Sequence, residues 1–217
     1  MGVEVKNLHI EYPDQLVFND VNLSVPDDQI VAVHTDVLDG GTSLLKGIAG
    51  FLRGVNGEVW FEGYNLLEET PAEIRFRLGY VYEDQGLASI YSVFQNISLP
   101  MQFHTQLSNI EISEMVHEVC EFFAIPEYQY ELRPHQLNDV QTRMVNLARA
   151  LIVKPGLLLI DELEGGMPED YLRDTMQALK DRQAKYPMAI IMATSSDIVK
   201  ERADRVYLIE NNNLVAA

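Results

Sequence analysis

The segment that most constrains the fold runs from residue 30 to residue 50, with the sequence IVAVHTDVLDGGTSLLKGIAG. It begins with an apolar run of strand length, continues through a loop containing Gly40 and Gly41, and ends in residues with helical spacing. A strand that passes through a tight loop into a helix is typical of a parallel sheet covered by helices. Further apolar strands predict the rest of this sheet, near 78–82, 157–161, 188–194 and 205–209.

Other segments predict where the remaining elements begin and end. Short strands are expected near 3–6, 16–25 and 57–62, and helical periodicity dominates from roughly 90 to 152. Ser108 and Glu111 form a capping-box pattern ahead of an apolar helical face. Pro168 is expected to begin another helix, and the asparagines at 211–213 to turn a final hairpin. With 217 residues and 47% apolar content, the chain is expected to form one domain spanning 1–217.

The loop after residue 34 departs from the phosphate-binding pattern G-x-x-x-x-G-K-[ST] at two positions. In that pattern backbone N–H groups and the helix N-terminus surround the phosphates, and lysine adds a full positive charge. Here Thr35 stands at the first glycine and Gly41 at the lysine, while Gly40 and the hydroxyl of Thr42 fit. The loop also carries two carboxylates, Asp36 and Asp39. Since a charge-assisted hydrogen bond contributes roughly 1.5–3 kcal/mol, triphosphate binding is expected to be weak or absent.

Almost the whole chain resembles the ATP-binding subunit of ABC transporters in the order and spacing of its motifs. The resemblance covers VEVKNL (3–8), Tyr12, FNDVNLSVPDDQIVAV (18–33), LLKGIAGFLRGVNGEVWFEGYNL (44–66) and LGYVYED (78–84). It continues through SVFQNISLPMQFH (92–104), where it is most similar to the ATPases of Mce-type and Mla-type lipid transporters. The LSGGQ signature corresponds to LNDVQ (137–141) ahead of LARAL (147–151), and Walker B to LLLIDE (157–162).

This resemblance implies a P-loop NTPase-like core sheet, an N-terminal antiparallel β subdomain and a helical subdomain at roughly 90–152. It also implies a nucleotide site for ATP and Mg²⁺. The implied cofactor-binding residues are Tyr12, against adenine, with Thr35, Gly40, Gly41, Thr42, Ser43, Asn138 and Gln141. The implied Mg²⁺ ligands are Thr42, Asp161 and Glu83, which takes the place of the family's glutamine. Glu162 corresponds to the glutamate that polarises water, and Ser195 to the switch histidine.

Several positions depart from the family pattern, which puts catalysis in doubt. Both signature glycines are replaced, by Asp139 and Val140, and the proline and aspartate that follow Walker B become Leu163 and Pro168. Phosphoryl transfer depends on positioning and charge neutralisation, so this site is expected to be slow or inactive. Asp161 and Glu162 can equally be remnants at a strand end, and Tyr12 can be ordinary surface packing.

Composition limits the partners of the chain. The net charge of −17, from 33 acidic and 16 basic residues, argues against direct binding of nucleic acid or anionic lipid. No apolar run is long enough to span a bilayer, and the N-terminus lacks an apolar signal core, so we expect a cytoplasmic protein without direct membrane insertion. Cys120, the single cysteine, lies in a periodic helix, and the five histidines lack metal-ligand spacing.

Three functional hypotheses follow. The leading one is a pseudo-ATPase subunit on the cytoplasmic face of a bacterial inner membrane, docked on a permease of an Mce/Mla-like lipid transporter and paired with another ATPase subunit. The second is a weak ATPase that uses Thr42, Asp161 and Glu162 with a cation from its partner. The third is a soluble scaffold or regulatory module that works without any permease.

Overall fold

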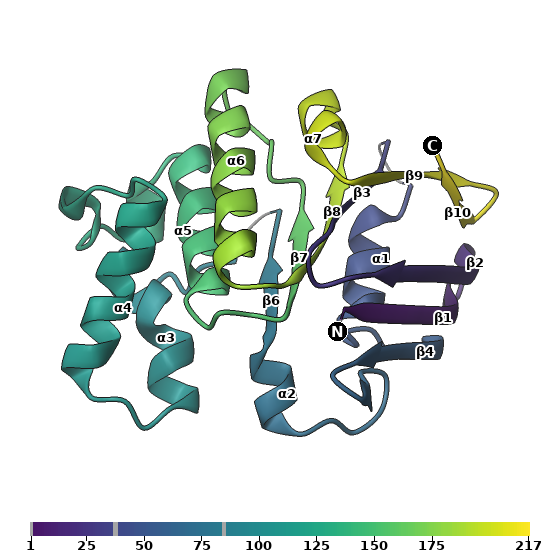
Figure 1. Cartoon of the computed structure of the whole chain (residues 1–217), viewed down its shortest axis with the longest axis horizontal. Coiled ribbons are helices and arrows are strands. Elements are labelled where there is room, and N and C mark those ends of the chain that lie inside the picture. The colour runs from purple at the N-terminus through teal and green to yellow at the C-terminus, as the bar shows by residue number, and fades with distance from the viewer. Residues whose placement is uncertain (1, 37–38, 84–85) are drawn as a thin grey trace.

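The computed structural model describes residues 2–36, 39–83 and 86–217 and contains two sheets (Figure 1). The larger sheet has the strand order β10-β9-β3-β8-β7-β6. Its strands are β3 (Ile30–His34), β6 (Leu78–Val81), β7 (Leu157–Asp161), β8 (Ala189–Thr194), β9 (Arg205–Glu210) and β10 (Asn213–Ala216). All neighbours are parallel except β10, which pairs antiparallel with β9.

The central strands of this sheet are buried on both faces, which explains their continuous apolar sequences. Their side chains alternate between two hydrophobic clusters. In β7, Leu158 and Ile160 face the cluster beneath the helices, whereas Leu157 and Leu159 face the cluster shared with the second sheet. The sheet therefore separates the core into two layers.

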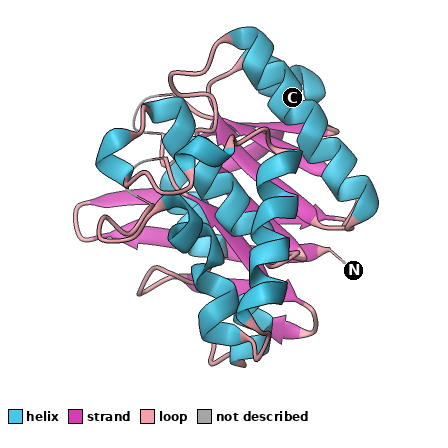
Figure 2. Cartoon of the chain, turned by 90° about the vertical axis from the view of Figure 1, so that its left-hand side faces the viewer, coloured by secondary structure: helices cyan, strands magenta, loops and turns pink. Residues whose placement is uncertain are grey.

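Helices cover the first of these faces. They are α3 (Val93–His104), α4 (Asn109–Phe122), α5 (Asp139–Leu151), α6 (Glu169–Lys185) and α7 (Asp197–Arg202). Figure 2 shows the molecule from the side on which α3 and α4 lie. The apolar face predicted after Ser108 is confirmed, because Ile112, Val116, Val119 and Cys120 of α4 are buried. Helix α6 likewise buries Leu172, Met176 and Leu179.

The smaller sheet has the order β2-β1-β4-β5 and is antiparallel. It consists of β1 (Val3–Tyr12), β2 (Gln15–Val25), β4 (Asn56–Phe61) and β5 (Tyr64–Asn65). Helix α1 (Gly41–Ile48) lies between the two sheets, with Leu44, Leu45 and Ile48 fully buried. The short helix α2 (Ala72–Phe76) then leads into β6.

Most predicted element ends agree with the structure. Ser108 and Glu111 cap α4 reciprocally, Pro168 precedes α6, and Asn211 and Asn212 turn the final hairpin with positive φ. The prediction for the first strand was wrong, because β1 continues to Tyr12 rather than ending near residue 6. Asn7 has φ 49° and the pairing register shifts between Val5 and Leu8, which interrupts the alternation of apolar residues.

Candidate functional site

Four parallel strands end at the same edge of the larger sheet and deliver the candidate site residues there. His34 at the end of β3 lies opposite Thr194 at the end of β8, and Asp161 at the end of β7 lies opposite Ala193. Thr35 follows β3 directly, and Glu83 follows β6. The carboxyl ends of parallel strands are the usual location of ligand sites in such sheets.

The loop after β3 needs glycine at two adjacent positions, for different reasons. Gly40 precedes α1 with φ 90°, in the left-handed region that favours glycine. Gly41 begins α1 at a position where a Cβ atom would lie 2.4 Å from Thr35 Cγ2 and 3.1 Å from Ala193 Cβ. Any side chain at 41 therefore collides with Thr35. The two departures from the phosphate-binding pattern, at 35 and at 41, are thus sterically linked.

A cavity of about 530 Å³ opens over this loop. Nine of the twelve predicted site residues line it: Tyr12, Thr35, Gly40, Gly41, Thr42, Ser43, Glu83, Asp161 and Glu162. Gln15, Val17, Asp36 and Asp39 complete the lining. Asn138, Gln141 and Ser195 lie outside it within this chain. Loop residues 37 and 38, and Asp84 at the end of the LGYVYED segment (78–84), lie outside the described residues.

The cavity is strongly acidic. Five carboxylates line it, from Asp36, Asp39, Glu83, Asp161 and Glu162, and no lysine or arginine is among the described lining residues. Lys46, one and a half turns into α1, does not line the cavity, although its charge is near enough to lower the pKa of Asp161. A polyanionic ligand entering here meets repulsion rather than charge neutralisation.

Burial and mutual repulsion act on the two Walker B carboxyls. Burial raises the pKa of Asp161 above its usual range; the Thr42 hydroxyl opposes this rise and the charge of Glu83 adds to it. The pKa of Glu162 is raised by burial and then by the charges of Glu83 and Glu164, against which Arg143 acts. Both carboxyls therefore hold protons more readily than in an exposed position.

The donor set does not suit a triphosphate. A phosphate cluster needs cationic or N–H donors, and here the position of the lysine is sterically closed by Thr35 while carboxylates surround the loop. The chemistry of Thr42 and Asp161 is compatible with Mg²⁺, and Asp161 Oδ1 is buried with no hydrogen-bond partner in the described chain. However, the described residues contain no group of three His, Cys, Asp or Glu side chains able to hold a metal ion. Among the described residues, the site thus keeps two groups that suit a metal ion, Thr42 and Asp161, and lacks the lysine of a phosphate-binding loop.

Tyr12 lies at the rim of the cavity. Its side chain is 41% exposed, and its hydroxyl lies 3.1 Å from Ser43 Oγ on α1. This contact orients the ring at the mouth of the cavity. Stacking on adenine remains a prediction, since the contact with Ser43 serves packing equally well.

The residues of the signature segment cap their own helix. Asn138 Oδ1 accepts from the Gln141 N–H at 2.8 Å, and Gln141 Oε1 accepts from the Asn138 N–H at 2.9 Å. This reciprocal capping box fixes the start of α5. Both side-chain oxygens are therefore engaged locally.

The sequence did not predict the residue that holds the switch loop, residues 194–196, which contains the switch position Ser195. Ser195 lies beside Glu164, whose Oε1 accepts from the Ser195 N–H at 2.8 Å and from the Thr194 hydroxyl at 2.5 Å. Glu164 is 31 residues from Ser195 in the sequence. No local pattern points to such a contact.

The steric link between Thr35 and Gly41 generates the first prediction. Gly41→Lys alone should lower the free energy of unfolding by about 1–3 kcal/mol, because the new Cβ overlaps Thr35. Adding Thr35→Gly should recover part of this loss, with a favourable coupling of about 0.5–3 kcal/mol in the double-mutant cycle. Urea unfolding of all four proteins measures the coupling, and additive effects would contradict the proposed collision.

The raised pKa of Asp161 generates the second prediction. The folded protein ionises this carboxyl less readily than the unfolded chain does. The free energy of unfolding therefore falls as the pH rises from the pKa of the unfolded state through the pKa of the folded state. Asp161→Asn removes that ionisation, so the variant should melt at a higher temperature than wild type at pH 7. Its advantage should shrink as pH falls towards 4, near the unfolded pKa of aspartate.

Melting curves across this pH range, with Asp197→Asn as control, provide the measurement. Asp197 is exposed and its pKa is lowered by its contact with Lys200, so its replacement should have no stabilising effect at pH 7. A variant at 161 that is less stable than wild type at pH 7 would be inconsistent with this account.

Comparisons with known proteins agree with the motif order. The ABC transporter family model matches residues 18–164. Among curated proteins, the intermembrane phospholipid transport system ATP-binding protein MlaF of Haemophilus influenzae is 28% identical over 99% of this chain and 82% of that protein. The lipoprotein-releasing system ATP-binding protein LolD of Psychrobacter arcticus is 26% identical over 91% of this chain and 88% of that protein.

The fold comparison points the same way. A dimeric ATP-binding cassette solved in a post-hydrolysis state with ADP and Pi has a TM-score of 0.88 at 20% identity, covering 98% of this chain and 96% of that one. This likeness confirms the predicted α/β cassette architecture, with its antiparallel β subdomain and helices. No helix within the described residues is long and apolar enough to cross a membrane. Because the family model matches most of its length, the chain belongs to the ABC transporter family, as an ATP-binding domain.

Proposed function

We propose that this chain is a catalytically impaired ATP-binding-cassette subunit that docks on a membrane permease and pairs with a second ATPase subunit. The main support is the acidic cavity, which is lined by five carboxylates. At its loop, Thr35 and Gly41 stand where the phosphate-binding pattern has a glycine and a lysine. ABC ATPase domains bind ATP, typically with Mg²⁺, dimerise and dock on transmembrane permeases. This chain retains docking and pairing but has lost efficient ATP hydrolysis.

The charge of the cavity supports weak nucleotide binding. A phosphoryl group in transfer spreads negative charge over its oxygens, and catalysis depends on groups that neutralise this charge. The described cavity offers carboxylates at Asp36, Asp39 and Glu83 instead. Losing one charge-assisted contact costs roughly 1.5–3 kcal/mol, and each nearby carboxylate adds repulsion to that loss.

The signature segment supports the same conclusion for the second half-site. In this family the signature of one subunit faces the nucleotide held by the other. Asp139 adds a negative charge at that position, and Asn138 and Gln141 are engaged in capping α5. A partner with an intact phosphate-binding loop would therefore meet a damaged signature in this chain.

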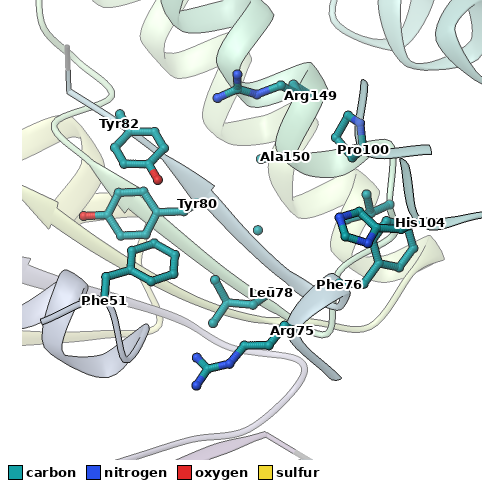
Figure 3. A pocket seen from close by; sticks show the side chains of 12 residues that line it. Phe51, Arg75, Phe76, Leu78, Tyr80, Tyr82, Pro100, His104, Arg149 and Ala150 are labelled. Carbon is teal, nitrogen blue, oxygen red and sulfur yellow. The ribbon is translucent and has the colours of Figure 1, made fainter. Parts of the chain in front are cut away.

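A groove beside β6, the edge strand of the larger sheet, supports docking. Figure 3 shows Phe51, Tyr80 and Tyr82 in a column along one wall, facing Pro100, Phe76 and His104 across the groove. The cavity there has a volume of about 260 Å³ and lies between the larger sheet and helices α3 and α5. Phe51 is 49% exposed, so an apolar partner side chain can pack against it.

The charge of the groove is opposite to that of the whole chain. Arg75, Arg149 and His104 line it, and no acidic residue is among its described lining residues. Arg75 donates to the carbonyls of Ala49 and Leu66, and Arg149 donates to Asn146 Oδ1 at 3.0 Å. A short helix of a permease that carries an acidic residue among apolar ones matches this lining.

The relatives suggest the class of transporter. The similar proteins include subunits named for intermembrane phospholipid transport and for lipoprotein release, and others named for methionine import at similar identity. The first two, together with the resemblance of residues 92–104 to lipid-transporter ATPases, support the proposal of a lipid-related transport complex, with this chain as a peripheral subunit on the cytoplasmic face of a bacterial inner membrane. With a net charge of −17, attachment through a permease fits better than direct binding to anionic lipid.

A weakly active ATPase is the second candidate, because Thr42, Asp161 and Glu162 all line the cavity. That candidate requires a cation from a partner, so activity should arise only in the reconstituted complex and disappear with Asp161→Asn. The third candidate, a scaffold that functions without a permease, requires recovery from the cytosol with no membrane subunit attached.

The third prediction concerns turnover. The purified chain should release no phosphate from Mg·ATP above the background of the same preparation carrying Glu162→Gln, because no lysine or arginine is among the described residues that line the cavity. A coupled phosphate-release assay measures this. Turnover that Glu162→Gln abolishes would reject the pseudo-ATPase proposal.

The fourth prediction concerns docking. Tagged chain purified from its native membranes in mild detergent should bring down a permease and an ATPase paralog, identified by mass spectrometry. Phe51→Ala should reduce the recovered permease, because it removes an exposed ring from the groove. Tyr64→Ala is the matched control, since Tyr64 is 43% exposed on β5 and does not line the groove. Equal loss with both variants would argue against this groove as the docking site.

A further inference from the structure

We propose that Glu164 replaces nucleotide as the anionic ligand of the switch loop, residues 194–196, and so holds this loop in one position whether or not nucleotide is present. The inference deepens the proposed function, on which it rests for its biological meaning, by naming the contact that makes the site independent of nucleotide. Nothing in the local sequence around Glu164 indicates this role.

The loop directs four donors at one carboxylate oxygen. Glu164 Oε1 accepts from the Thr194 hydroxyl at 2.5 Å, the Ser195 N–H at 2.8 Å and the Ser196 N–H at 3.1 Å. The Ser195 hydroxyl lies 3.4 Å from the same oxygen. Consecutive backbone N–H groups with converging hydroxyls form the kind of nest that binds phosphate or carboxylate. Here the nest is filled by a side chain of the same protein.

The backbone around Glu164 is shaped to present this carboxylate. Glu162 adopts a left-handed φ of 42° and its N–H donates to the Ala193 carbonyl at 3.0 Å, which turns the chain directly after β7. The Met167 N–H then donates to the Glu164 carbonyl at 2.8 Å. The carboxylate therefore leaves a closed turn and points at the end of the neighbouring strand, β8.

Helix α5 supports the same turn from the other side. Arg143 Nε donates to the Glu162 carbonyl at 3.3 Å. The Arg143 guanidinium also packs against Gly165, where a Cβ atom would lie 2.2 Å from one of its terminal nitrogens. The turn at 162–167 thus joins three parts of the site: β7, the switch loop and the helix that carries the signature segment.

Glu164 also changes what an incoming anion meets. Its charge contributes to the raised pKa of Glu162, so it acts within the same cluster as the cavity carboxylates. A phosphate that approached the switch loop would have to displace Glu164 from its charge-assisted bonds and overcome its repulsion. The donors of the loop are consequently engaged before any nucleotide arrives.

The test is amide hydrogen exchange of Ser195 and Ser196 by NMR in the full chain without nucleotide. Glu164→Ala should raise the exchange of both amides by roughly tenfold or more, because each loses a charged acceptor. Glu164→Gln, which keeps one acceptor oxygen without the charge, should raise it less. Glu169→Ala is the matched control, since this exposed glutamate on α6 contacts Arg173 and should leave both amides unchanged.

Chemical rescue distinguishes the loss of a bound anion from a general increase in the mobility of the switch loop. Added sodium formate should restore slow exchange of both amides in Glu164→Ala, and sodium chloride of equal ionic strength should not, because the vacated nest selects a carboxylate. Unchanged exchange in Glu164→Ala, or failure of formate to slow it in a folded variant, would overturn the proposal.

The exchange experiment is independent of turnover, so the two proposals fail separately. A chain that hydrolyses ATP but shows the exchange pattern above would reject only the pseudo-ATPase assignment. In wild type, Mg·ATP should leave both amides unchanged. Protection that appears only with Mg·ATP would show that nucleotide holds the loop, and would overturn the role of Glu164.

Discussion

The parallel register of β3, β8, β7 and β6 is the constraint on which the whole site depends. Because these strands run in the same direction, their carboxyl ends meet at one edge and bring together segments separated by up to about 160 residues. The strands themselves are apolar and buried on both faces, so the first polar side chains after each strand are the ones that gather there. In this chain the side chains after β6 and β7 are acidic, Glu83 and Glu162, whereas those after β3 and β8 are the hydroxyls of Thr35 and Ser195.

The replacements at this edge are consistent with one another. Thr35 occupies space that a side chain at 41 would need, and Gly41 leaves that space free. Asn138 and Gln141 satisfy each other at the start of α5, and Glu164 satisfies the switch loop. Several groups that would act on a nucleotide in the family therefore have a partner or a packing role within this protein, whereas Asp161 Oδ1 is buried without a hydrogen-bond partner in the described chain.

The sequence was sufficient to predict the larger sheet, the acidic end of β7 and the caps of α4 and α6, because each depends on local periodicity or a capping pattern. It misplaced the end of β1, where the left-handed Asn7 breaks the alternation. The cap formed by Asn138 and Gln141 carries the same signal as Ser108 and Glu111, and the same rule would have found it. The contacts of Glu164 could not be predicted from local patterns, since its partners follow another strand and are brought beside it only by the pairing of β7 with β8. Nine predicted site residues line one cavity. Whether these residues hold a cofactor depends on the summed charge of the cavity, which no single motif predicts.

We expect this cavity not to bind Mg·ATP with useful affinity. Isothermal titration of the purified chain with Mg·ATP, in low-salt and physiological-salt buffer, tests it most directly, with an ABC ATPase of intact motifs as positive control. Saturable binding should be absent up to millimolar nucleotide, and low salt should not increase the affinity, because repulsion from the five carboxylates is least screened there. Stoichiometric binding with a micromolar Kd would contradict it.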